Sequence, residues 1–82
     1  MGKDFFRISY CEPTVLWRLR HEDGRHAHGK IIPRLHDASA VWFINDLPEA
    51  AQDFEDGATA VKWLEEVRST LERNGWGRER AG

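Results

Sequence analysis

The alternation of apolar and polar side chains between Thr14 and Ile32 constrains the fold of this chain more than any other feature. Residues 14–21 alternate, the acidic and glycine-containing segment Glu22-Asp23-Gly24 follows, and residues 25–32 form a plausible return strand. Two such stretches around a short turn are typical of a β-hairpin. Because neighbouring side chains on a strand point to opposite faces of a sheet, the register of this hairpin decides what is buried.

Two registers of the hairpin compete. A two-residue Asp23-Gly24 loop would pair His21 with His26 and Leu19 with His28. A three-residue loop that includes Glu22 would instead pair Trp17 with Gly29, Leu19 with Ala27 and Val15 with Ile31. We predict the three-residue loop, with Gly24 as the bulge, because it separates the apolar side chains from the polar ones. The polar face then carries Arg18 opposite His28 and Arg20 opposite His26, beside Lys30.

The rest of the chain contains signals for two more strands and one helix. Residues 5–11 alternate and end at Glu12-Pro13, and residues 39–45 are the most apolar run, which indicates a central strand. The acidic stretch that ends at Asp56 is either a loop or a short edge strand around Phe54. Apolar residues at helical spacing predict a helix over residues 57–74, with Asp56 as N-cap and Gly75 after its last turn. Residues 77–82 are expected to be a disordered tail.

These elements predict one small domain, residues 1–82, of the α+β class. Its expected architecture is a three- or four-stranded antiparallel meander with one C-terminal helix packed on one face. Nine aromatic residues and 40% apolar content supply the core. A single helix leaves the other sheet face open. We predict that this face carries five basic side chains and one aromatic from the pair Trp42 and Phe43; the candidate interaction residues are therefore Arg18, Arg20, His26, His28, Lys30, Trp42 and Phe43.

The sequence argues against catalysis and against a bound cofactor. The chain has one cysteine, Cys11, which excludes an internal disulfide and a cysteine-based zinc site. His26 and His28 have a spacing that suits metal sharing, but the further ligands of a structural site are missing, so no metal site is predicted. No nucleophile elbow, phosphate loop or dinucleotide fingerprint is present. We therefore predict that the protein is not an enzyme and has no catalytic or cofactor-binding residues.

Charge is distributed unevenly along the chain. The net charge is −2, yet residues 1–36 hold seven basic and four acidic side chains, and residues 37–82 hold five basic and ten acidic ones. The segment Asp46–Asp56 contains five acids and no base. No apolar run is long enough to span a bilayer and no signal peptide is evident, so a soluble, cytoplasmic protein without membrane contact is expected.

The open sheet face suggests two functions. The leading hypothesis is a non-enzymatic interaction module that contacts an unidentified protein partner, or a second copy of itself, because aromatic patches rimmed by charge are often contact surfaces. The alternative is a nucleic-acid-binding module, because proteins that bind single strands combine basic side chains with aromatic platforms.

The alternative also has support from a family resemblance. The pattern Trp17, Arg20, Gly24-Arg25, Phe54-Glu55, Ala60 and Trp63-Leu64 resembles that of the arm-binding domains of tyrosine recombinases, in which a three-stranded sheet is followed by a helix. In that family the sheet enters the major groove of DNA. The resemblance therefore implies a DNA-facing set of Arg18, Arg20, Arg25, His26, His28 and Lys30.

Overall fold

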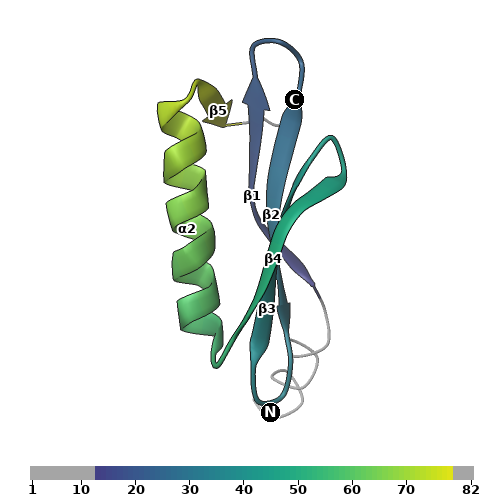
Figure 1. The fold of residues 1–82 in the computed structure, drawn as a ribbon, viewed down its shortest axis with the longest axis vertical. Helices are drawn as coiled ribbons and strands as arrows, with labels where there is room; N and C mark the ends of the chain where they lie inside the picture. Colours follow the sequence, from purple (N-terminus) through teal and green to yellow (C-terminus); the bar gives the residue numbers. More distant parts are fainter. Residues whose placement is uncertain (1–12, 79–82) are drawn as a thin grey trace, which may run out of the picture.

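The protein is a five-stranded antiparallel sheet with one helix along one face, as seen in a computed structural model that describes residues 13–78 (Figure 1). The strands are β1 (Thr14–His21), β2 (His26–Pro33), β3 (Ala38–Ile44), β4 (Leu47–Phe54) and β5 (Trp76–Arg78), and the helix is α2 (Gly57–Arg73). Their order across the sheet is β4-β3-β2-β1-β5. The predicted α+β class, antiparallel sheet and C-terminal helix are confirmed, but the predicted count of three or four strands is wrong. The predicted strand over residues 5–11 lies outside the described residues.

The β1–β2 hairpin has the predicted three-residue loop. The amide of His21 donates to the carbonyl of Arg25 (2.8 Å), and Gly24 has a φ of 99°. Trp17 pairs with Gly29 and Leu19 with Ala27, as the separation of apolar from polar side chains requires. One expected pair is wrong, because a bulge between Val15 and Trp17 shifts the register. Val15 consequently lies opposite Lys30 instead of Ile31.

The acidic segment after β3 forms a complete edge strand. Asn45 and Asp46 both have positive φ, 51° and 68°, which is the backbone of a two-residue hairpin turn whose twist matches that of the flanking strands. β4 then runs back along β3 from Leu47 to Phe54. Of the two readings left open for this segment, the edge strand is correct, and it is much longer than a few residues around Phe54.

The residues that follow the helix also join the sheet. Gly75 has a φ of 97°, a conformation that glycine adopts without steric cost, and it reverses the chain after the helix. Trp76 is buried, and β5 pairs with the end of β1 from Leu19 to His21. The expected tail over residues 77–82 is therefore wrong for Gly77 and Arg78, because burial of Trp76 holds them against β1.

The core lies between the sheet and α2. Asp56 caps the helix by accepting a hydrogen bond from the amide of Thr59 (2.8 Å). The indole Nε1 of Trp17 donates to the carbonyl of Leu64 (3.0 Å), which ties β1 to the helix. The buried residues that gather there are Trp17, Leu19, Ala27, Ile31, Ala38, Ala40, Ala60, Leu64 and Trp76. Within residues 13–78, no helix is both long and apolar enough to cross a membrane.

Candidate functional site

The sheet face opposite α2 gathers the basic side chains of β1 and β2. Arg18 lies opposite His28 and Arg20 opposite His26, and Lys30 lies between Val15 and Val41. Strand alternation sends these side chains away from the helix, because Trp17, Leu19 and Ala27 are buried on the other side. Both arginines are exposed, and the two histidines and Lys30 are half-buried. We call these five residues the basic face: Arg18, Arg20, His26, His28 and Lys30.

The aromatic residue of the basic face is Phe43, not Trp42. Phe43 pairs with His28, and their rings stack with centroids 4.5 Å apart and planes 13° apart. The Lys30 Nζ lies 5.4 Å from the centroid of the Phe43 ring. Trp42 pairs with Gly29 and packs against the core under α2. The choice between Trp42 and Phe43, which the sequence left open, is thereby settled.

Burial and neighbouring charge keep His28 neutral at neutral pH. Partial burial lowers the pKa of His28 below its usual 6.5, and the cations of Lys30 and Arg18 lower it further. At neutral pH His28 therefore adds little to the positive charge of Lys30 and Arg18 beside it.

A polar cluster lies on the same face of the sheet, where β3 begins and β4 ends. The Ser39 hydroxyl donates to the carboxylate of Asp53, its cross-strand neighbour, and Arg34 donates to the Ser39 Oγ (2.7 Å). The hydrogen bond from Ser39 and the nearby Arg34 guanidinium hold the pKa of Asp53 below its usual value. Arg34 also donates to Asp37 (2.7 Å). This cluster is not predicted from the sequence, because the contact between Ser39 and Asp53 depends on β4, whose full length the sequence does not reveal.

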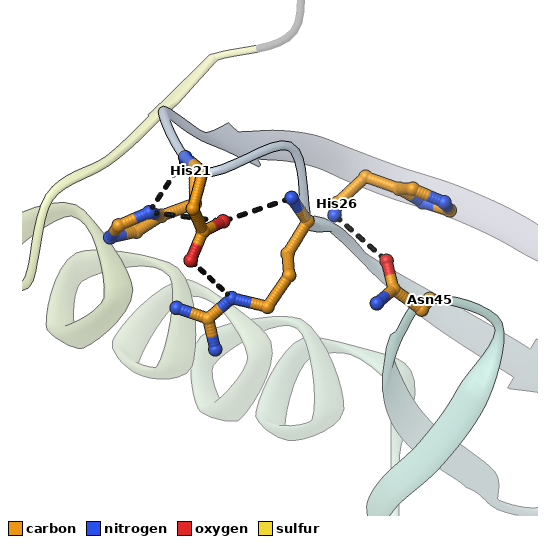
Figure 2. Close-up of polar contacts among 5 residues, drawn as sticks. His21, His26 and Asn45 are labelled. Atoms are coloured by element: carbon orange, nitrogen blue, oxygen red, sulfur yellow. Dashed lines mark hydrogen bonds and ion pairs between the residues drawn. The ribbon is translucent and has the colours of Figure 1, made fainter.

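The turn that joins β1 to β2 has its own network of hydrogen bonds, drawn in Figure 2. The Asp23 carboxylate accepts hydrogen bonds from the amide and the Nε of Arg25, at 3.0 and 2.8 Å, and the Asp23 amide donates to the Nδ1 of His21 (3.3 Å). The Arg25 guanidinium lies 5.2 Å from the centroid of the Trp76 ring. Arg25, which the family resemblance placed with the DNA-facing residues, is thus held in the turn beside Asp23 and Trp76.

Figure 2 also shows a contact between His26 and Asn45, which joins β2 to the β3–β4 turn. The side-chain oxygen of Asn45 accepts from the amide of His26 (3.2 Å), and the amide of Asn45 donates to the His26 carbonyl (2.8 Å). These two bonds fix the backbone of β2 at the position from which the His26 side chain projects.

The described part of the chain offers no metal centre. His26 and His28 share a face at a spacing of two, but residues 13–78 contain no group of three or more His, Cys, Asp or Glu side chains arranged to hold a metal ion.

Comparison with protein-family models, curated proteins and solved structures gave no match. The function of the basic face is therefore inferred from its own geometry.

Proposed function

We propose that this protein is a non-enzymatic binding module and that its basic face binds single-stranded nucleic acid. The observation that carries the proposal is the gathering of five basic side chains on adjacent strands of a face that α2 leaves uncovered. Within residues 13–78, no acidic residue is paired in the sheet with Arg18, His26, His28 or Lys30. Local patches of this kind govern the approach of a charged ligand more than net charge does.

The apolar content of this face supports a charged ligand in preference to face-to-face association of two copies. Phe43 is flanked by His28 and Lys30, and Trp42 is packed under the helix. The exposed large apolar side chains of the described residues are Leu35, Leu47 and Val61, which lie in a loop, at the start of β4 and on α2. Two copies that met through their basic faces would bring like charges together.

The face offers a nucleic acid two kinds of contact. Arg18, Arg20 and Lys30 supply cations for phosphates, and each phosphate that is neutralised releases counterions. The His28 ring, which stacks on Phe43, lies beside those cations, and a base that stacks on an aromatic ring gains about 1–3 kcal/mol. A duplex hides its bases, so a single strand is expected to bind more tightly than a duplex of the same length.

Fluorescence anisotropy with a short labelled DNA strand tests the proposal. Three phosphate contacts predict that the logarithm of the affinity falls with the logarithm of the salt concentration with a slope of about −2. Arg18→Ala, Arg20→Ala and Lys30→Ala should each weaken binding and each make the slope shallower by about 0.7. The matched control is Lys62→Ala, because Lys62 is an exposed cation on α2.

The control and a second ligand decide between the outcomes. An affinity that does not change with salt concentration, or an equal loss of affinity in Lys62→Ala, would contradict the proposal. Binding of polyglutamate with the same dependence on Arg18 and Lys30, without binding of the DNA strand, would instead assign the face to an acidic protein partner.

A further inference from the structure

Both sides of the sheet end in a strand edge that the described residues leave open. β4 is the outer strand on one side, and every side chain in it except Phe54 is exposed. On the other side, β5 covers β1 only from Leu19 to His21, and no strand within residues 13–78 pairs with the outer edge of 15–18. Unpaired backbone N–H and C=O groups on such edges can accept a further strand.

A groove lies beside the open part of β1. It has a volume of about 560 Å³ and runs between β1 and α2, with Leu16 and Trp17 in its lining and Arg78 of β5 at its edge. Arg68 and Glu65 of α2 also line it, and so does Arg18 of β1, whose charged side chain belongs to the opposite face of the sheet. The groove is therefore both apolar and positively charged.

Arg68 has an unused donor in this groove. One of its terminal nitrogens pairs with Glu65 and the other lies 3.5 Å from Glu72, but its Nε is buried without a hydrogen-bond partner. A buried donor without a partner is costly. Because this Nε has almost no exposed surface, a segment in the groove reaches it only if the Arg68 side chain moves.

The edge of β4 has the properties that match this groove. Glu49 and Asp53 belong to β4, in a stretch of five acids and no base from Asp46 to Asp56. Leu47, at its start, is 67% exposed, although large apolar side chains are usually covered. An exposed strand with acidic residues and one free apolar side chain suits a groove that is lined by arginines and Leu16.

We propose that β4 of a second copy adds to the edge of β1 at residues 15–18, which no strand within residues 13–78 covers, and extends the sheet. All neighbouring strands are antiparallel, so β4 runs opposite to β1 within one copy. A second copy in the same orientation therefore presents β4 antiparallel to β1, as the sheet already requires. In this arrangement the Leu47 end of β4 meets the Arg78 end of the groove, and Glu49 lies near Arg78.

The contact joins two different surfaces, so it does not close on itself. Each added copy leaves one open β4 and one open β1 edge, and the assembly lengthens with concentration. All copies keep the same orientation, so their basic faces lie side by side on one surface. This association does not depend on whether the basic face binds nucleic acid.

Sedimentation of the full chain tests the proposal when the wild type is compared with variants that reverse the charge at Arg78 or at Glu49. The weight-average mass of the wild type should rise with concentration above that of the 9.5 kDa chain. Arg78→Glu and Glu49→Arg should each return it to that of a single chain. An equimolar mixture of the two variants, and the double variant, should associate again because opposite charges then meet.

Controls separate this contact from loss of folding and from general charge effects. Lys62→Glu and Glu66→Arg make the same charge changes on exposed positions of α2 and should associate like the wild type. Circular dichroism checks that each variant is folded. A wild type that stays monomeric up to millimolar concentration would overturn the proposal and leave the groove to another occupant. Association that survives both variants, or that the mixture does not restore, would also overturn it.

Discussion

Gly29 and Trp17 show how one missing side chain positions the contact between sheet and helix. Gly29 lies opposite Trp17, and a Cβ built on it would lie 2.5 Å from the Cε2 and 2.6 Å from the Cζ2 of the indole. The indole therefore lies flat over the glycine and reaches the Leu64 carbonyl with its Nε1. Any larger residue at position 29 must displace Trp17 and break this contact.

Gly29→Ala is therefore expected to destabilise the protein, although alanine suits a strand better than glycine. Forcing an extra carbon into a filled core costs about 1–3 kcal/mol, and urea denaturation should show a loss of this size. Gly77→Ala is the control, because its Cβ would meet nothing within 4 Å. Equal stability of Gly29→Ala and Gly77→Ala would show that Trp17 does not lie over Gly29.

His28 is expected to make the stability of the protein depend on pH. Burial lowers its pKa in the folded state below the usual 6.5, so the unfolded chain binds protons more readily. The stability that His28 contributes is present above 6.5 and is lost as the pH falls through 6.5 toward the lowered pKa. Denaturation at neutral pH and at about pH 5 should show that acidification lowers the free energy of unfolding more for the wild type than for His28→Gln. Equal losses would mean that His28 is as hydrated when folded as when unfolded.

At the scale of elements, the sequence predicts those parts whose side chains are sorted by burial. In β1 and β2 apolar and polar side chains alternate, and the register that best separates the two kinds is the one observed. In α2 the apolar residues recur at helical spacing, Asp56 caps the start and Gly75 follows the end. The same register correctly predicts the pairing of Arg18 with His28 and of Arg20 with His26. These predictions succeed because burial on one face leaves a periodic pattern.

The parts that could not be predicted lack that pattern. β4 is exposed on both faces, so nothing in its side chains alternates, and only the Asn45-Asp46 turn indicates that the chain folds back. β5 has three residues and depends on one buried side chain, Trp76. The choice between Trp42 and Phe43 could not be made because both faces of β3 are apolar, and only its pairing with β2 assigns Phe43 to the basic face.

β5 is expected to depend on Trp76. This side chain is buried in the core, its ring meets that of His21 edge-on at 5.2 Å, and Arg25 lies over it. Trp76→Ala should lower the free energy of unfolding by about 3–5 kcal/mol, as measured by denaturation, because it leaves a large cavity. Arg73→Ala, an exposed change in the last turn of α2, should have little effect. A stable Trp76→Ala variant would show that β5 is not held by its burial.

At the scale of the whole molecule, the sheet separates charge in two directions. The face under α2 is apolar and the opposite face is basic on β1 and β2, while the acids of β4 lie at the far edge of the sheet. A protein of net charge −2 can therefore present a positive surface on β1 and β2 to a polyanion, with Asp53 of the β4 edge on the same sheet face and Asp46 near His28. If the basic face binds a polyanion as proposed, this separation of charge would orient the polyanion as well as attract it.

The most direct test of the proposed function is an amide NMR titration of labelled protein with a short DNA strand at low salt. We expect shifts that cluster on residues 16–31 and on Phe43, that spare α2, and that vanish when salt is raised. The absence of shifts at millimolar concentration, or shifts centred on α2 and β4, would contradict nucleic-acid binding by the basic face.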